Sequence, residues 1–192
     1  MTAPLIILAG PAGSGKSTIL ARLLKDSGLP LRLSVSATTR RPRDYERDGT
    51  HYYFWTFDQF QEKKKAGAFL EYAEVHGQWY GTLRSEVDDY RAKGVGVLLD
   101  IDVQGAARVR ALYPECVSIF LRTSSWEEYE KRLVKRGEAP ESIARRLATA
   151  RRELERIGEF DHVVVNDDLE RAVARVRELV GQAFEKGSCD AG

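Results

Sequence analysis

Residues 10–17 read Gly-Pro-Ala-Gly-Ser-Gly-Lys-Ser and match the pattern Gly-x4-Gly-Lys-Ser/Thr, which is typical of a glycine-rich loop that binds phosphate. The backbone N–H groups of such a loop converge on phosphate oxygens at the positive end of the following helix. Lys16 adds a mobile positive charge for the terminal phosphates, and the Ser17 hydroxyl suits a Mg²⁺ ligand. The apolar residues 5–9 predict a strand before the loop, and residues 18–24 predict a helix after it. The alternative, a glycine-rich turn that merely begins a helix, leaves this agreement unexplained.

Two aspartates follow another apolar run. Asp100 comes directly after residues 95–99, which predict a buried strand, and Asp102 lies two positions further on. Residues two apart on an extended chain point to the same side, so both carboxylates would face one site. An acid at this place can hold Mg²⁺ through its waters, opposite the loop hydroxyl. The alternative is that the two acids cap the helix that we expect at residues 105–112.

Arginines gather in two regions. Residues 40–43 read Arg-Arg-Pro-Arg, and planar guanidinium groups suit a phosphate dianion. Arg132 and Arg136 are four residues apart, hence on one face of a helix, and Arg146 lies near the start of the next predicted helix. A segment with several arginines can close over a nucleotide and neutralise the charge of phosphoryl transfer. Each cluster, taken alone, also fits a solvated surface with glutamate partners.

Residues 38–80 are rich in aromatic side chains, and within them residues 51–55 and 69–73 predict strands of a small second sheet. The polar and aromatic candidates there are Tyr52, Glu71, Trp79 and Tyr80. Tyrosine hydroxyls can donate to phosphate, and a carboxylate among aromatic rings can read the edge of a base. The alternative is a small hydrophobic core with a glutamate on its surface.

The elements that must position these residues alternate along the chain. Strands are predicted at residues 5–9, 31–35, 95–99, 117–121 and 163–165. Further helices are predicted at residues 83–92, 105–112, 126–135, 143–157 and 169–184. The alternation predicts an α/β fold with a mainly parallel sheet and with the phosphate loop at the carboxyl end of a strand. A length of 192 residues fits one domain with smaller lobes.

Composition narrows the function classes. The net charge of +1 gives no support for attraction to nucleic acid. No apolar stretch approaches the length of a membrane span, and the N-terminus lacks the pattern of a signal peptide. Cys116 lies in an apolar run and Cys189 in a polar tail, which indicates neither a disulfide framework nor a zinc site, and the three histidines lack ligand spacing. We therefore expect a cytoplasmic protein without nucleic-acid or membrane partners.

On these residues and on further motifs, the chain resembles the guanylate kinases, a family of nucleoside monophosphate kinases, from residue 5 to about residue 184. The further motifs are Ser-Val-Ser-Ala-Thr-Thr-Arg-Arg-Pro-Arg at 34–43, Gly-Thr-His-Tyr-Tyr-Phe at 49–54, Phe-Leu-Glu-Tyr-Ala at 69–73, Trp-Tyr-Gly-Thr at 79–82, Leu-Asp-Ile-Asp-Val-Gln-Gly at 99–105 and Val-Asn-Asp-Asp at 165–168. Several separate motifs in this order are far more specific than a phosphate loop alone.

The resemblance implies an α/β fold with a P-loop three-layer core, a small β-rich insert that binds GMP, and a helical lid. The core would comprise residues 1–35, 94–125 and 160–186, the insert residues 36–93 and the lid residues 126–159. Independently of the resemblance, we expect a disordered tail at residues 187–192. The implied reaction is Mg²⁺-dependent transfer of the γ-phosphoryl group of ATP to GMP, and also to dGMP.

The resemblance also implies the site residues. Those for ATP are Gly10, Pro11, Ala12, Gly13, Ser14, Gly15, Lys16, Ser17, Thr18 and Asn166. Those for GMP are Arg40, Arg43, Tyr52 and Tyr80 at the phosphate, Ser36, Glu71, Thr82 and Asp102 at the guanine, and Asp100. The catalytic residues would be Lys16, Arg40, Arg132, Arg136 and Arg146, and the Mg²⁺ ligands Ser17 and, through water, Asp100.

The chemistry of Glu71 agrees with this assignment. Guanine presents two adjacent donors, N1–H and its amino group, which one carboxylate can accept, whereas adenine presents an acceptor at N1. Glu71 therefore argues against the alternative function of a kinase for another monophosphate. The presence of Lys16, Asp100 and the lid arginines argues against the other alternative, a binding module without catalysis.

The chain departs from the family pattern at Tyr45, where the family commonly has glycine. We expect this change to alter the turn at residues 42–49 without touching a proposed ligand.

Overall fold

The computed structural model describes residues 2–189, apart from residues 27, 76, 136 and 138 and the side chains of residues 187–189. Its larger sheet has the strand order β2-β7-β1-β8-β9, and each neighbouring pair is parallel. These strands are β1 (Leu5–Ala9), β2 (Leu31–Leu33), β7 (Gly96–Asp100), β8 (Val117–Arg122) and β9 (His162–Val165). The predicted α/β fold with a mainly parallel sheet is confirmed.

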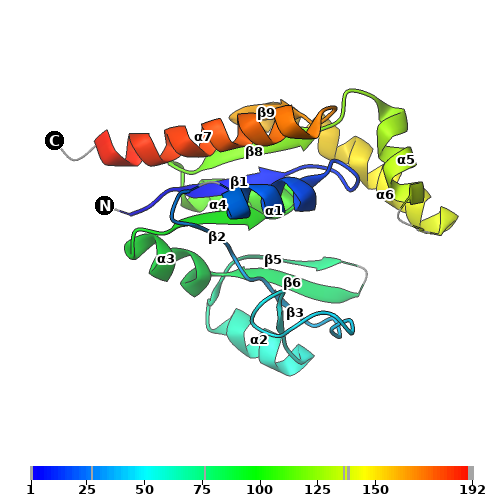
Figure 1. Ribbon diagram of the computed structural model, residues 1–192. Coiled ribbons are helices and arrows are strands. Elements are labelled where there is room, and N and C mark those ends of the chain that lie inside the picture. Colours follow the sequence, from blue (N-terminus) through cyan, green and yellow to red (C-terminus); the bar gives the residue numbers. More distant parts are fainter. Residues whose placement is uncertain (1, 27, 76, 136, 138, 190–192) are drawn as a thin grey trace.

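Helices cover both faces of this sheet (Figure 1). The helices are α1 (Lys16–Asp26) and α7 (Leu169–Cys189) on one face, and α3 (Arg84–Ala92) and α4 (Val103–Leu112) on the other. Every residue of β1 is buried, because alternate side chains enter opposite layers: Ile6 and Leu8 pack with α1 and α7, whereas Leu5 and Ile7 pack with α3 and α4. The core therefore has the expected three layers.

A smaller sheet lies beside the core (Figure 1). Its elements are β3 (Ala37–Thr38), β4 (Tyr53–Phe54), β5 (Phe69–Val75) and β6 (Gln78–Leu83), with helix α2 (Phe57–Lys65). The strand order is β4-β3-β6-β5, and a separate hydrophobic cluster of Ala37, Phe60, Phe69 and Leu83 holds the sheet to α2. The sequence patterns predicted β4 and β5 but neither β3, β6 nor α2.

A pair of helices, α5 (Trp126–Lys135) and α6 (Pro140–Glu155), extends from the far end of β8, and a 3-10 helix, η1 (Ile157–Glu159), leads back to the sheet. The helix predicted at residues 143–157 is thus divided between α6 and η1.

Two of the boundaries that we expected between parts of the chain differ from those in the structure. Helix α7 continues to Cys189, beyond the expected start of a disordered tail at residue 187. Helix α3 packs on the core sheet through Val87, although the expected insert of residues 36–93 includes it.

Within the described part of the chain, we find no helix that combines the length and the apolar character needed to cross a bilayer.

Candidate functional site

The glycine-rich loop connects β1 to α1, and two of its glycines are required by their surroundings. Gly10 has φ +144°, and a Cβ there would lie 2.1 Å from the carbonyl oxygen of Leu121 on β8. Gly15 has φ +98°, and a Cβ there would lie 2.2 Å from Nδ2 of Asn166, which follows β9. The loop is therefore packed tightly against β8 and β9, which fixes its position at the carboxyl ends of the strands.

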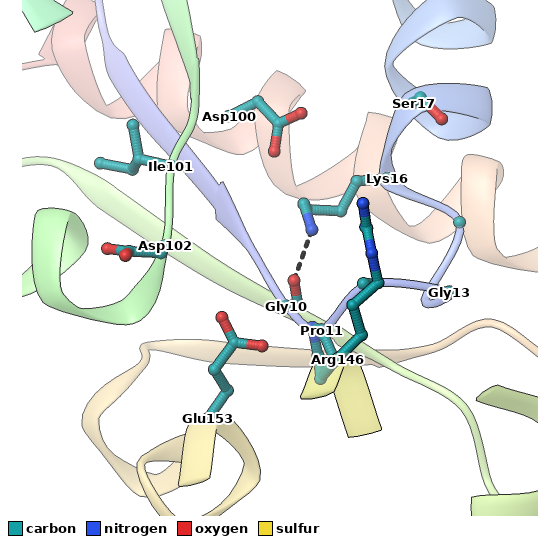
Figure 2. A pocket seen from close by; sticks show the side chains of 12 residues that line it. Gly10, Pro11, Gly13, Lys16, Ser17, Asp100, Ile101, Asp102, Arg146 and Glu153 are labelled. Carbon is teal, nitrogen blue, oxygen red and sulfur yellow. Dashed lines mark hydrogen bonds between the residues drawn. The ribbon is translucent and has the colours of Figure 1, made fainter. Parts of the chain in front are cut away.

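A pocket of about 350 Å³ opens in front of this loop. It is lined by Gly10, Pro11, Ala12, Gly13, Gly15, Lys16, Ser17, Asp100, Ile101, Asp102, Arg146 and Glu153. Figure 2 shows Arg146 and Glu153 entering this first pocket from α6, across from the two aspartates. The Lys16 ammonium donates a hydrogen bond to the carbonyl oxygen of Gly10, so it lies along its own loop (Figure 2). Of the predicted ATP-binding residues, Ser14, Thr18 and Asn166 are not among the lining residues.

The first pocket combines acidic and basic groups. Asp100 stands at the end of β7, where its side chain is open to the pocket but closely surrounded by protein. This burial raises the pKa of Asp100, whereas the positive charge of Lys16 lowers it. Burial likewise raises the pKa of Glu153, and Lys16 again opposes the shift. Glu153 was not predicted as a site residue, because in the sequence it is one of several charged residues on α6.

The oxygen donors of the first pocket fit Mg²⁺. Ser17 and Asp100 line the same pocket and offer a hydroxyl and a carboxylate, which are the hard ligands that Mg²⁺ prefers. In the described ranges, no group of three or more His, Cys, Asp or Glu side chains could hold a metal ion by itself. This donor set fits an ion that keeps several waters and is shared with bound phosphates.

A second pocket, of about 180 Å³, lies between the small sheet and the end of β7. It is lined by Ser36, Tyr52, Glu71, Ala73, Val75, Tyr80, Gly81, Asp100, Ile101 and Asp102. The last three of these residues also line the first pocket, so the two pockets share one wall. The predicted GMP-binding residues thus come together here, apart from Arg40, Arg43 and Thr82, which are not among the lining residues.

Glu71 is the buried acid of the second pocket, with 8% of its surface exposed. Thr82 is fully buried and donates its hydroxyl hydrogen to Glu71 Oε1 at 2.7 Å, so it lies behind Glu71. Burial raises the pKa of Glu71, while the Thr82 hydrogen bond stabilises the carboxylate and acts in the opposite direction. We expected Thr82 to face the base, whereas in this structure its hydroxyl holds the Glu71 carboxylate, which lines the second pocket.

Asp102 has two roles in the structure. It is the N-cap of α4, because its Oδ1 accepts the backbone N–H of Gly105 at 2.7 Å, and it also lines both pockets. The helix-capping alternative is therefore correct for Asp102 without excluding a role in the site.

Arg40 and Arg43 are held by a third residue, Glu46, which the sequence analysis did not assign. Arg40 makes a bidentate pair with Glu46, at 2.9 Å and 2.8 Å, and the backbone N–H of Arg43 donates to Glu46 Oε2 at 2.8 Å. The Arg40 guanidinium and this N–H lower the pKa of Glu46 to about 2. Arg40 also lies 5.6 Å from the ring centre of Tyr52, which lines the second pocket. This contact places Arg40 next to that pocket.

Tyr45 contacts one of the predicted phosphate-binding arginines. Arg43 Nη1 lies 2.9 Å from the Tyr45 hydroxyl oxygen and donates to it. The expectation that Tyr45 touches no proposed ligand is therefore wrong.

The predicted lid arginines do not act as one group in this structure. Arg132 on α5 donates to the carbonyl oxygens of Gly13 and Ser14, both at 3.3 Å, and to that of Asn166 at 2.8 Å. Arg132 therefore supports the phosphate loop from outside, whereas Arg146 lines the first pocket. Arg136 lies outside the described residues.

Comparisons with known proteins agree with this arrangement. The family model described as guanylate kinase matches residues 2–183. A guanylate kinase from Synechococcus sp. (strain CC9311) is 49% identical over 173 residues, which cover 90% of each chain. A guanylate kinase from Symbiobacterium thermophilum is 46% identical over 92% of this chain and 83% of its own. The crystal structure of guanylate kinase from Anaplasma phagocytophilum superimposes with a TM-score of 0.77 at 33% identity, covering 95% of this chain and 87% of that one.

Proposed function

This chain belongs to the guanylate kinase family and transfers a phosphoryl group from ATP to GMP, and we propose that the first pocket receives ATP and the second receives GMP. One observation carries this assignment: Asp100, Ile101 and Asp102 line both pockets. Phosphoryl transfer requires the donor and the acceptor to approach in line, and a shared wall supports such an approach.

On the donor side, the backbone N–H groups of residues 10–18 would hold the phosphates of ATP. Lys16 would leave the carbonyl oxygen of Gly10 and move its charge to the terminal phosphates. Asn166 would act through the loop, because its Nδ2 donates to the carbonyl oxygen of Ser14 at 2.7 Å.

We propose that Ser17 and, through water, Asp100 hold Mg²⁺ in the first pocket. When bound, the ion would supply positive charge at the transferred phosphoryl group. Burial raises the pKa of Asp100 and the positive charge of Lys16 acts in the opposite direction, so a further cation beside Asp100 would also favour its charged form.

On the acceptor side, Glu71 would accept the N1–H and amino donors of guanine, with Thr82 holding Glu71 in place. Ser36 and Asp102 line the same pocket and would complete the contacts to the base. The phosphate of GMP would be bound by Arg40, Arg43, Tyr52 and Tyr80. We also propose dGMP as a second acceptor, since none of these contacts requires the ribose 2′-hydroxyl.

The attacking group is already an ionised phosphate oxygen, so the reaction needs no general base. Alignment, Lys16 and arginines would supply the catalysis. Arg146 lines the first pocket and would face the transferred group directly, and Arg132 would act through the loop that it supports. A role for Arg136 is proposed from the family resemblance alone.

We propose that residues 126–159 close as a lid over the first pocket and that the insert, without α3, closes over GMP. Closure would exclude water and limit wasteful hydrolysis of ATP.

We further propose a cytoplasmic location, where ATP and GMP are present and a free, buried thiol such as that of Cys116 stays reduced. Small nucleotides, rather than nucleic acid, are the expected ligands at a net charge of +1.

The experiment that tests the acceptor site is a coupled ADP-release assay with GMP, AMP, UMP and CMP. We expect GMP to be strongly preferred, and we expect Glu71→Gln to lose on the order of 100-fold or more in kcat/KM for GMP. Glu74→Gln is the matched control, because Glu74 is exposed on the same strand. A preference for AMP, or equal activity of the two variants, would contradict the assignment of Glu71.

A further inference from the structure

Gly105 lies in the first turn of α4, and its backbone does not explain why it is glycine. Its φ lies outside the left-handed region, so a residue with a side chain could adopt this conformation. Glycine is also a poorer helix former than alanine, because it loses more backbone entropy when the helix forms. A glycine here is therefore unfavourable for the helix itself, and its neighbours must supply the reason for it.

The reason is the carboxylate of Glu71. A Cβ built on Gly105 would lie 3.0 Å from Glu71 Oε2, 3.2 Å from Glu71 Cδ and 3.4 Å from Asp102 Oδ1. Contacts of 3.0–3.4 Å are tighter than a Cβ normally makes, so one of the groups would have to move by a few tenths of an ångström. Two carboxylates of the second pocket thus lie against the space that the missing side chain leaves open.

Glu71 has little freedom to move away. Its side chain is buried, and its Oε1 is held by the Thr82 hydroxyl at 2.7 Å. The pairing of β5 with β6 shifts register between Phe69 and Glu71, so the backbone at Glu71 is set by a local irregularity of the sheet. A group added at Gly105 would therefore displace the carboxylate from its present position in the pocket.

We propose that Gly105 is a positioning residue that determines specificity for guanine, because its bare backbone lets the Glu71 carboxylate settle against the start of α4. The inference rests on the proposed assignment of Glu71 to the base. The start of a helix also favours a negative charge, which suits the ionised acid that guanine requires. The backbone N–H of Gly105 in addition holds Asp102 Oδ1 at 2.7 Å, so both acids take their positions from this turn.

The first test compares Gly105→Ala with Gly181→Ala. Gly181 lies within α7, and its φ is also outside the left-handed region. A Cβ built on Gly181 would meet no atom within 4 Å. We expect Gly105→Ala to weaken GMP binding, measured by calorimetry without ATP, roughly tenfold, the usual size of a disturbed buried hydrogen-bonding pair. The KM for ATP should stay unchanged, and the ratio of GMP to IMP affinity should fall, because IMP lacks the amino group. Gly181→Ala should leave all three quantities unchanged.

The second test measures how Gly105→Ala changes the unfolding temperature in the wild-type protein and in the Glu71→Ala variant. In the wild-type background, Gly105→Ala should lower the unfolding temperature because the added methyl group would press on the carboxylate. In a Glu71→Ala background the carboxylate is gone, so the same change should raise the unfolding temperature through better helix formation. If the Glu71→Ala background fails to fold, the GMP and IMP affinities of the single variant still decide the question.

The outcomes distinguish the role of Gly105 from the assignment of Glu71 to the base, on which it rests. If Glu71→Gln binds GMP like the wild type, the assignment of Glu71 fails. If Glu71→Gln loses GMP but Gly105→Ala binds it normally, or shifts stability equally in both backgrounds, only the role of Gly105 is refuted.

Discussion

The side-chain amide of Asn166 donates to the carbonyl oxygen of Ser14 at 2.7 Å, so a residue that follows β9 holds the phosphate loop from behind. Gly15 makes this contact possible, since any Cβ there would collide with the same amide. Arg132 completes the arrangement by donating to the carbonyl oxygens of Ser14 and Asn166. The shape of the loop therefore depends on α5 and β9 as well as on its own glycines.

Arg132→Ala should loosen the loop. Loss of the contacts to the loop and to Asn166 is expected to raise the KM for ATP roughly tenfold and to leave the affinity for GMP unchanged. Steady-state kinetics with each substrate varied in turn measures both quantities. Lys131→Ala is the control, because the neighbouring Lys131 makes an exposed ion pair with Glu128. Equal effects of Arg132→Ala on both substrates would contradict a role in the loop.

Lys16→Ala should remove the mobile charge at the transferred group. We expect kcat to fall on the order of 100-fold or more, with the circular dichroism spectrum and the GMP affinity preserved. The measurement is kcat at saturating concentrations of both nucleotides. A nearly normal kcat would refute the assigned role of Lys16.

Arg43→Ala should weaken GMP more than ATP, since its guanidinium is assigned to the acceptor phosphate. Tyr45→Phe removes only the hydroxyl that Arg43 contacts and should have the same direction of effect at a smaller size. Separate calorimetric titrations with GMP and ATP measure this difference. Arg41→Ala serves as the control on the exposed neighbour. An equal loss for both nucleotides in Arg43→Ala would speak against a dedicated phosphate site.

Glu46→Gln should change how stability depends on pH. The pKa of Glu46 falls from its ordinary value of 4.5 to about 2 in the folded protein, so the folded state favours the charged form. The resulting stabilisation is fully present above the unfolded pKa and is lost as the pH falls from about 4.5 to about 2. Unfolding temperatures of the wild type and Glu46→Gln should therefore differ by a constant amount above pH 5 and converge below it. A constant gap down to pH 3 would contradict this origin.

Thr82→Val should shift the pH dependence of GMP binding. The proposed pairing with guanine uses the ionised form of Glu71, so we expect binding to strengthen as the pH rises through the pKa of this acid. The Thr82 hydroxyl stabilises the carboxylate, and its loss raises that pKa further, which moves the binding midpoint to higher pH. Titrations with GMP between pH 5 and pH 9 measure the shift, and Thr82→Ser should restore the wild-type midpoint.

The core of the fold could be predicted because its strands are continuous apolar runs and its helices show clear periodicity. The elements of the insert gave weaker signals. Strand β3 has two residues, and β6 contains Gly81, whose missing side chain makes room for the ring of Phe69. Helix α2 did have a local signal, the capping box of Thr56 and Gln59, which a search for helix starts would have found.

The grouping of the site residues was implied by the family resemblance, and the motifs that carry it stand at the ends of strands or in the insert beside them. The residues that these side chains contact in the structure could not be predicted from the sequence. Arg40 pairs with Glu46, and Arg132 with the phosphate loop, through contacts that depend on where α5 and the turn at residues 42–49 lie in three dimensions. Glu153 enters the first pocket only because α6 folds back across it.

The common wall of Asp100, Ile101 and Asp102 has a practical consequence for inhibitor design. A compound that joins adenosine to guanosine through one polyphosphate chain would span both cavities at once. It would lose its translational freedom a single time, and each half would raise the effective concentration of the other. Such a tethered molecule should bind far more tightly than either nucleotide alone, provided that its bridge follows the path between the two cavities.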